Sequence, residues 1–294
     1  YYQNRGVKNI LIEDIYIGNG VSELISLVMM ALLNTDDEVL IPSPDYPLWT
    51  TVVGLAGGNA VHYECNEEDE WNPNLSDIES KISSKTRAIV LINPNNPTGA
   101  VYSKEELTSF ADVLVKYPHI LIGTDDMYEH VKLKDMPFYN ILNVNPALKD
   151  RCVIMNGVSK AYSMTGWRIG YAAGPSYIIK AMEILQSQST SNPTSISQVA
   201  AEAAISGDQT CMKPMIKAFR ERHAYVVKSF NEIPGLSCIE AEGAFYAFPD
   251  ARKAIEHLFN QKILKEKKYN IARRTVAKYR EQLEIPVGRM RKEL

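Results

Sequence analysis

The feature that most constrains the fold is a regular alternation between short apolar runs and longer amphipathic stretches. The apolar runs have strand length and lie within "EDIYIGNG", "DEVLIPSP", "GNAVHYEC", "RAIVLIN", "HILIGTDD" and "RCVIMNG". Between them, "VSELISLVMMALL", "LSDIESKI" and "SKEELTSFADVLVKY" show the spacing of helices. Apolar strands that alternate with helices indicate a mostly parallel sheet with helices on both faces. The sequence therefore predicts an α/β fold.

Two helices carry local signals of their own. In the segment 21–33, Leu24, Val28 and Leu32 fall on one face, as expected for a helix that packs against a sheet. In the segment 75–82, Ser76 is followed three residues later by Glu79, which is the pattern of a capping box. We therefore expect this short helix to begin at Ser76.

Composition narrows the class of protein. With 294 residues, of which 45% are hydrophobic and 23% charged, the chain has room for one large or two ordinary domains. It shows no apolar run of membrane-spanning length and no signal peptide. The four cysteines are far apart, so there is no CxxC motif for a metal or a redox pair. We expect a cytoplasmic protein without a metal site.

Polar motifs follow the predicted strands at the points where they end. These motifs are "GNGVSE", "SPDYPLW", "NPNNPTG", "TDDMYEH" and "NGVSK". In open parallel sheets, ligands bind beyond the carboxyl ends of the strands, so we expect one site at this edge. The first motif lacks the third glycine of GxGxxG, and a dinucleotide fingerprint is therefore not supported.

Within "NGVSKAYSMTGWRIGY", Lys160 and Arg168 stand in an apolar segment that is rich in small residues. A buried lysine is costly unless it is paired or neutralised, so Lys160 lies either at the surface or where chemistry needs it. A pyridoxal phosphate site requires such a lysine for the aldehyde, a carboxylate for the pyridine nitrogen, donors for the phenolic oxygen and a phosphate-binding helix start. The strand-end motifs offer a candidate for each.

The motifs "NPNNPTG", "TDDMYEH" and "NGVSKAYSMTGWRIGY" resemble those of the fold-type I pyridoxal phosphate-dependent aminotransferases of classes I and II. The resemblance runs from Tyr1 to about Ile263. The opening half is more similar to bacterial glutamate–pyruvate (alanine) aminotransferases, and the part after about Tyr102 to bacterial aspartate aminotransferases. It implies pyridoxal 5'-phosphate as cofactor, an amino acid and a 2-oxo acid as substrates, and a homodimer.

The resemblance also assigns roles around the cofactor ring. Lys160 resembles the lysine that forms the Schiff base and moves the substrate proton, and Asp125 resembles the partner of the pyridine nitrogen. Asp126 is adjacent, but Asp125 has the family's spacing to the tyrosine. Tyr128 and Asn96 resemble the donors to the phenolic oxygen, for which core packing and a turn-forming asparagine are the structural alternatives.

The remaining assignments concern the phosphate and the ring face. Val21 and Ser22 resemble the phosphate cup, Arg168 the phosphate arginine, and Ser159 a further phosphate contact, although the family's usual serine falls where this sequence has a glycine. Tyr46 resembles the aromatic residue that stacks on the ring. The structural alternatives are a salt bridge for Arg168 and an ordinary turn for Tyr46.

Two parts of the family pattern are missing from the sequence. We expect an N-terminally incomplete chain that lacks the arm capping the substrate, and we find no match to the C-terminal arginine motif that binds the substrate carboxylate. The predicted domains are a cofactor-binding large domain at 1–220, the start of a small domain at 221–263 and a basic tail at 264–294. Such a chain is expected to turn over slowly.

The tail has a composition of its own. From Lys262 to Leu294 it has 11 Lys and Arg against 4 Asp and Glu, whereas the whole chain has 32 and 35. The stretch "ARRTVAKYRE" at 272–281 resembles the C-terminal box of the nitrogen-type RNA polymerase sigma factor, a helix-turn-helix that reads promoter DNA. The resemblance implies DNA contacts by Arg273, Arg274, Lys278 and Arg280. The alternative is chance similarity in a basic helix.

Two functions follow. The first is an amino acid aminotransferase that uses pyridoxal phosphate with aspartate or alanine and a 2-oxo acid such as 2-oxoglutarate. The second is a non-catalytic body of the same fold with a DNA-binding tail. The lysine, carboxylate, tyrosine and arginine of the strand-end motifs favour the first, and the basic tail favours the second.

Overall fold

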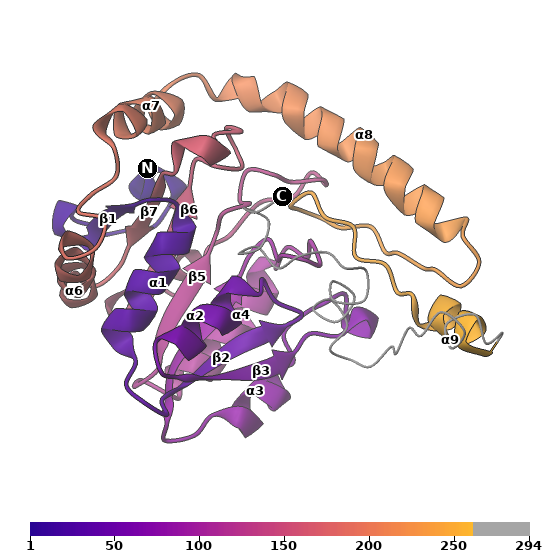
Figure 1. Ribbon diagram of the computed structural model, residues 1–294, viewed down its shortest axis with the longest axis horizontal. Helices are drawn as coiled ribbons and strands as arrows, with labels where there is room; N and C mark the ends of the chain where they lie inside the picture. Colours follow the sequence, from indigo (N-terminus) through magenta and orange to yellow (C-terminus); the bar gives the residue numbers. More distant parts are fainter. Residues whose placement is uncertain (261–294) are drawn as a thin grey trace, which may run out of the picture. The chain divides into compact units, whose positions relative to one another are not determined.

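The computed structural model describes residues 1–260, whose helices and strands alternate along the chain (Figure 1). The strands are β1 Ile15–Gly18, β2 Glu38–Ser43, β3 Asn59–Glu64, β4 Thr86–Ile92, β5 Leu121–Asp125, β6 Cys152–Gly157 and β7 Gly170–Ala173. The α-helices are α1 Val21–Leu32, α2 Leu48–Leu55, α3 Leu75–Lys81, α4 Lys104–Val115, α5 Ile141–Val144, α6 Ser176–Ser187, α7 Ser195–Ser206, α8 Met212–Asn231 and α9 Arg252–Asn260.

The seven strands form one sheet in the order β1-β7-β6-β5-β4-β2-β3. Strands β2 to β6 pair in parallel, while β7 is antiparallel to both of its neighbours, β6 and β1. Strand β1 therefore runs in the same direction as β6, and β7 is the reversed strand. The predicted α/β class with a mostly parallel sheet is confirmed.

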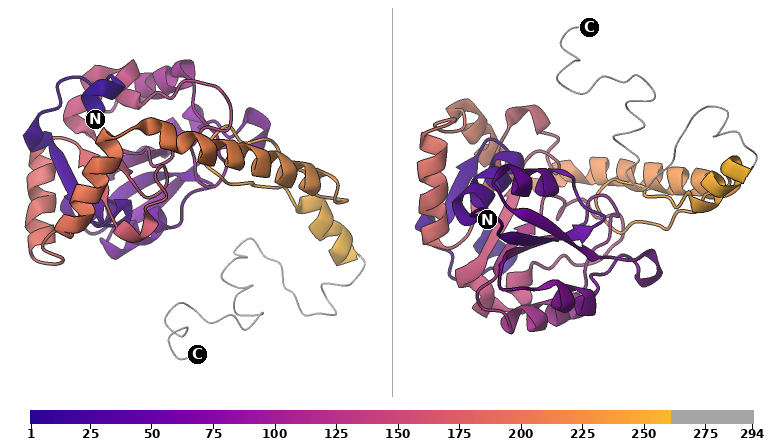
Figure 2. Two further views of the ribbon diagram at one scale, coloured as in Figure 1. Left: turned by 90° about the horizontal axis from the view of Figure 1, so that it is seen from above. Right: turned by 60° about the horizontal axis from the view of Figure 1, so that its bottom comes forward.

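Strand β4 shows why helices cover both faces of this sheet. Its residues alternate between two apolar cores, as side chains of a strand must. Ala88 and Val90 are fully buried in a core shared with α1, α2 and α6, whereas Ile89 and Leu91 lie in a core shared with α4 and α5. The views in Figure 2 show helices on either side of the sheet.

Helix α3 begins two residues earlier than a Ser76 cap would allow, so the predicted cap at Ser76 is wrong. The N-cap is Asn74, whose Oδ1 accepts a hydrogen bond from the Asp77 N–H at 3.1 Å. Ser76 lies inside the helix, and its hydroxyl donates to the same Asn74 oxygen at 2.7 Å. Asparagine is at least as good an N-cap as serine, so the earlier polar residue takes the role.

The chain divides into two structural units. The first comprises Tyr1–Val226 together with Glu240–Phe248, and the second comprises Val227–Ile239 and the chain from Pro249 onward. In the second unit, the backbones of Ser237 and Asp250 exchange hydrogen bonds of 3.0 and 2.7 Å. The first unit contains the whole sheet.

The predicted tail at 264–294, with Arg273, Arg274, Lys278 and Arg280, lies outside the described residues. Within residues 1–260, none of the helices combines the length and apolar character that crossing a lipid bilayer requires.

Candidate active site

A cavity of about 200 Å³ lies in the first unit, at the edge of the sheet where β5 and β6 end. The nine residues predicted for the cofactor site all line it: Val21, Ser22, Tyr46, Asn96, Asp125, Tyr128, Ser159, Lys160 and Arg168. They come from separate segments of the sequence, so the fold is what brings them together. Met127, Thr165 and Tyr246 complete the lining.

The register of the strands explains why these segments meet. Gly18, Gly170 and Gly157 lie side by side on β1, β7 and β6, and Asp125 at the end of β5 pairs with Ile92 at the end of β4. The loops that follow β1, β4, β5 and β6 and the loop that precedes β7 therefore leave the sheet at one edge. The polar segments at the carboxyl ends of the strands thus meet around one cavity.

The start of α1 is open toward this cavity. Its N-cap is Gly20, which has a φ of 81° and offers no side chain to the first turn. A side chain at Gly20 would meet the Arg168 guanidinium, and a Cβ at Gly170 would lie 2.6 Å from the Val21 nitrogen. Glycine at both positions thus allows the backbone and the arginine to approach the helix start.

Arg168 is held at that helix start by backbone carbonyls. Its Nη1 donates to Thr165 O at 3.1 Å and its Nη2 to Asn19 O at 3.2 Å. The side chain is exposed rather than buried, although its sequence neighbours are apolar and small. Because a helix N-terminus is electropositive, the guanidinium and the first N–H groups of α1 together form a site suited to an anion.

Lys160 is half-buried and faces an aromatic wall. Its Nζ lies 6.0 Å from the centre of the Tyr128 ring and 5.6 Å from that of Phe245. Asp125 lies nearby and is 6% exposed. Burial raises the pKa of the Asp125 carboxyl to about 6, while the Met127 N–H and the Lys160 charge lower it. The pocket thus has an amine and a carboxylate at its base.

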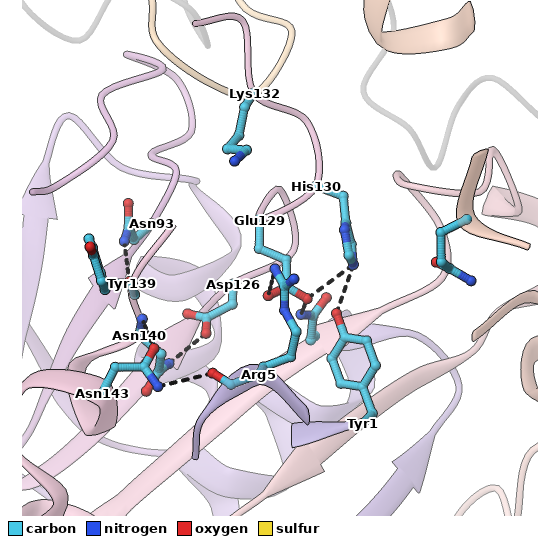
Figure 3. A network of polar contacts seen from close by, with 12 residues as sticks. Tyr1, Arg5, Asn93, Asp126, Glu129, His130, Lys132, Tyr139, Asn140 and Asn143 are labelled. Carbon is cyan, nitrogen blue, oxygen red and sulfur yellow. Dashed lines mark hydrogen bonds and ion pairs between the residues drawn. The ribbon is translucent and has the colours of Figure 1, made fainter. Parts of the chain in front are cut away.

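The neighbouring Asp126 points elsewhere. Its Oδ2 accepts a hydrogen bond from Asn140 Nδ2 at 2.5 Å, and Figure 3 shows the two side chains directed at each other. Burial, together with the Asp125 charge, raises the pKa of Asp126 to about 7 against the hydrogen bond from Asn140. Of the two adjacent carboxylates, the one chosen from its spacing to Tyr128 is the one that lines the cavity.

Tyr246 is the main residue that the sequence interpretation missed. Its hydroxyl is hydrogen-bonded to the Tyr128 hydroxyl, and the two rings meet edge to face at 5.6 Å. The segment reaches the cavity because the Ala244 N–H donates to Val131 O at 2.8 Å. The stretch "EGAFYAFPD" is rich in aromatic residues next to a glycine, but its distance in the sequence gave no sign of this contact.

The model of one protein family, "Aminotransferase class I and II", matches residues 1–293. The chain belongs to this aminotransferase family. The match continues past Ile263, where we expected the resemblance to end, and it includes the segment that resembles a sigma factor box.

The sequence is also similar to those of individual aminotransferases. The chain is 50% identical to the aspartate/prephenate aminotransferase of Nitrosomonas europaea, over 85% of this chain and 63% of that protein. It is 39% identical to the glutamate-pyruvate aminotransferase of Escherichia coli K12, over 90% and 69% of the two chains. The chain thus spans about three-fifths of the length of the aspartate/prephenate aminotransferases that it matches.

Solved aminotransferase structures have the same fold. The aspartate aminotransferase from Rhizobium meliloti superposes with a TM-score of 0.81 at 39% identity, covering 83% of this chain and 61% of that one. An aminotransferase from Escherichia coli gives a TM-score of 0.79 at 39% identity, covering 91% and 68%.

Proposed function

We propose that this aminotransferase chain binds pyridoxal 5'-phosphate in the cavity at the ends of β5 and β6 and transfers an amino group between an amino acid and a 2-oxo acid. The observation that carries the proposal is the meeting of Lys160, Asp125 and Arg168 around one cavity. These residues supply an amine, a carboxylate and an anion site, which are the groups that this cofactor needs.

The anion site fits the phosphate of the cofactor. Helix α1 begins without a side-chain cap, so its first N–H groups can donate to phosphate oxygens. Arg168 adds a planar guanidinium whose geometry suits a phosphate. The close approach at Gly20 and Gly170 leaves this cradle free of side chains. Ser22 and Ser159, which line the same cavity, offer hydroxyl donors.

The other end of the cavity fits the ring. We propose that Asp125 holds a proton on the pyridine nitrogen, because a nearby negative charge favours the cationic form. Tyr128 and Asn96 offer donors to the phenolic oxygen, and Tyr46 offers an aromatic face. Tyr246, which lines the same cavity, is hydrogen-bonded to the Tyr128 hydroxyl.

Bound pyridoxal phosphate supplies an aldehyde for the amino group and a ring that withdraws electrons from the reacting carbon. The role of Lys160 is to hold the cofactor through its Nζ and, when released, to move a proton to and from the α-carbon of the substrate. The Lys160 Nζ lies 6.0 Å from the centre of the Tyr128 ring and 5.6 Å from that of the Phe245 ring, so the amine lies beside the residues proposed to contact the cofactor ring.

The substrates are proposed at the level of class. Relatives of this chain bear the names aspartate/prephenate and glutamate-pyruvate aminotransferase, so aspartate and alanine are the amino donors to test first, with 2-oxoglutarate as acceptor. A homodimer is proposed with them, as the resemblance implies.

The experiment is a coupled transamination assay on the full chain with added pyridoxal phosphate. The parent is expected to produce oxaloacetate or pyruvate, and Lys160→Ala is expected to lower the rate by about four orders of magnitude, the upper range for loss of a general acid–base group. Lys81→Ala removes a lysine of α3 that does not line the cavity and serves as the matched control. Equal rates in the parent and Lys160→Ala would contradict the proposal.

Residues 272–281 carry a second, independent proposal. The resemblance to a sigma factor box suggests DNA binding by Arg273, Arg274, Lys278 and Arg280, and the excess of basic residues from Lys262 onward supports it. The match of the aminotransferase family model to the same residues weighs against it.

A further inference from the structure

A buried carboxylate lies on the side of the β5 turn that faces away from the cavity. Glu129 is 4% exposed and does not line the cavity, so it does not touch a ligand bound there. A buried charge is costly unless it is paired and hydrogen-bonded. The partners of Glu129 therefore indicate what the residue is for.

The two oxygens of Glu129 bind different parts of the first unit. Oε1 accepts a hydrogen bond from Asn156 Nδ2 at 2.8 Å, and Oε2 pairs with Arg5 Nη2 at 3.1 Å. Figure 3 shows the Glu129 and Arg5 side chains directed toward each other. Burial lowers the pKa of nearby His130 to about 4, so its imidazole is neutral near pH 7, and burial also raises the pKa of Glu129 to about 8 against the hydrogen bond from Asn156. Arg5, whose Nη2 lies 3.1 Å from Glu129 Oε2, is the cation of the cluster and favours the ionised form of Glu129. We call Arg5, Glu129 and Asn156 the Glu129 cluster.

Asn156 connects this cluster to the segment that carries Lys160. It is 2% exposed and stands near the end of β6. Its Oδ1 accepts from the N–H of Gly157 at 2.7 Å, which orients its Nδ2 toward Glu129. Four residues later along the same segment comes Lys160.

The connection matters because the sheet no longer joins the two segments at this point. The last ladder bond between them runs from Asp126 N to Met155 O at 2.9 Å. Within residues 1–260, the bond from Asn156 Nδ2 to Glu129 Oε1 is the one hydrogen bond that joins the turn 127–131 to the segment 156–160. The cavity residues Tyr128 and Lys160 lie on these two segments.

The turn is closed by hydrogen bonds of its own, which connect Glu129 to its neighbours. The Glu129 N–H donates to Asp126 O at 3.0 Å, and the Val131 N–H donates to Tyr128 O at 2.8 Å. The Met127 N–H bonds the carboxylate of Asp125 at 3.3 Å. The turn thus presents Asp125 and Tyr128 to the cavity while it presents Glu129 to Asn156.

We propose that Glu129 is a positioning residue that fixes the spacing between the Asp125–Tyr128 turn and the Lys160 segment through Asn156. The catalytic consequence rests on the proposed function, because only then do Tyr128 and Lys160 act on one ligand. The ion pair to Arg5 holds the carboxylate in place, a use of buried ionic groups in which geometry matters more than net stability.

The test compares five variants of the full chain, of which Asn156→Ala and the double variant Glu129→Ala/Asn156→Ala probe the partner of Glu129. Glu129→Ala removes both contacts, Glu129→Gln keeps an oxygen that can accept from Asn156, and Asp37→Asn is the matched control. Asp37 pairs with Arg87 at 2.9 Å with side-chain exposures of 8% and 43%, against 4% and 38% for Glu129 and Arg5. It lies next to the start of β2, at the opposite end of the strands.

The first readout is amide hydrogen exchange in the protein without cofactor. In Glu129→Ala, the amides of Val158 and Tyr162, which bond Ile169 O and Val158 O, are expected to exchange about tenfold faster, as a local opening rather than global unfolding would produce. In Glu129→Gln, the exchange rates of these two amides are expected to stay within about threefold of the parent. In Asp37→Asn, they are expected to change only as far as the global stability of the protein changes. Asn156→Ala should speed the exchange of the same amides as much as Glu129→Ala does. The double variant Glu129→Ala/Asn156→Ala should exchange no faster than either single variant.

The second readout has two parts. One is the visible circular dichroism of added pyridoxal phosphate, and the other is the change in kcat and in KM, measured separately for each variant. A shifted dichroic band and a lower kcat at similar KM are expected in Glu129→Ala and not in Glu129→Gln. Unchanged exchange of Val158 and Tyr162 in both Glu129→Ala and Asn156→Ala would overturn the inference. If the parent itself binds no cofactor, the proposed function fails, while the exchange measurement still decides the positioning role.

Discussion

The two sides of the turn after β5 carry similar acidic side chains that differ in what they contact. On the cavity side, Asp125 and Tyr128 meet Lys160 and Tyr246, and Arg168 bonds backbone carbonyls at the helix start. On the other side, Glu129 and Asp126 are matched to Arg5, Asn156 and Asn140, as Figure 3 shows for Asp126, Glu129, Arg5 and Asn140. Charged groups gathered around a cavity are typical of a ligand site, whereas buried carboxyl groups that are hydrogen-bonded to neighbouring side chains are typical of architecture.

The largest expected difference between the two sides concerns Asp125. Asp125→Asn should slow exchange of the amino acid α-proton by about two to three orders of magnitude, because the ring loses the charge that keeps its nitrogen protonated. Cofactor affinity should change much less. The measurement is proton exchange of alanine or aspartate in deuterated water, followed by magnetic resonance. Equal exchange in the variant and the parent would show that Asp125 is not the partner of the ring.

The Asp126 side should respond to pH in stability rather than in catalysis. Its pKa is raised from 3.8 to about 7, so between these values the folded protein keeps a proton that the unfolded chain has released. The free energy of unfolding therefore falls as pH rises through this window, by at most about 1.4 kcal/mol per pH unit from this group. Asp126→Asn should flatten that slope in urea titrations. An equal slope of unfolding free energy against pH in the parent and in Asp126→Asn would contradict a raised pKa for Asp126.

A smaller effect is expected at the helix start. Gly20→Ala places a side chain at a φ of 81° and against the Arg168 guanidinium, a strain of about 1–3 kcal/mol. Affinity for pyridoxal phosphate should fall by about tenfold or somewhat more. Gly54→Ala is the matched control, since its Cβ would meet no atom within 4 Å. Equal affinities of Gly20→Ala and Gly54→Ala for pyridoxal phosphate would show that the start of α1 does not bind the phosphate.

The smallest effect concerns the basic tail. If Arg273, Arg274, Lys278 and Arg280 contact DNA, binding should be weak and should fall steeply with salt, because each neutralised phosphate releases a counterion. A duplex with the promoter element of the nitrogen-type sigma factor should compete better than a random duplex in a fluorescence anisotropy assay. Equal competition by both would leave a basic segment without sequence preference.

Much of the fold and of the candidate site could be predicted from the sequence because the signals are local. The alternation of apolar runs and helices predicted the sheet, and the family resemblance of the strand-end motifs predicted nine of the twelve residues that line the cavity. The reversed strand β7 was not foreseen, since four residues carry too little pattern to give direction. The helix start at Asn74 was missed because several polar residues competed for one cap.

The residues that escaped prediction are those whose roles depend on distant contacts. Tyr246 reaches Tyr128 across 118 positions and Arg5 reaches Glu129 across 124, and no periodicity or motif connects such pairs. Arg168 was predicted to face a phosphate, but its bonds to the carbonyls of Thr165 and Asn19 could not be predicted from the sequence. Local sequence patterns predict individual elements, whereas the tertiary fold determines which distant segments come into contact.

The central claim is that the cavity holds pyridoxal phosphate on Lys160, and peptide mapping after borohydride reduction tests it most directly. The full chain is incubated with the cofactor, reduced, digested and analysed by mass spectrometry. We expect one phosphopyridoxyl label, on Lys160, which is lost in Lys160→Ala and kept in Lys81→Ala. A label on other lysines with Lys160 unmodified would contradict it.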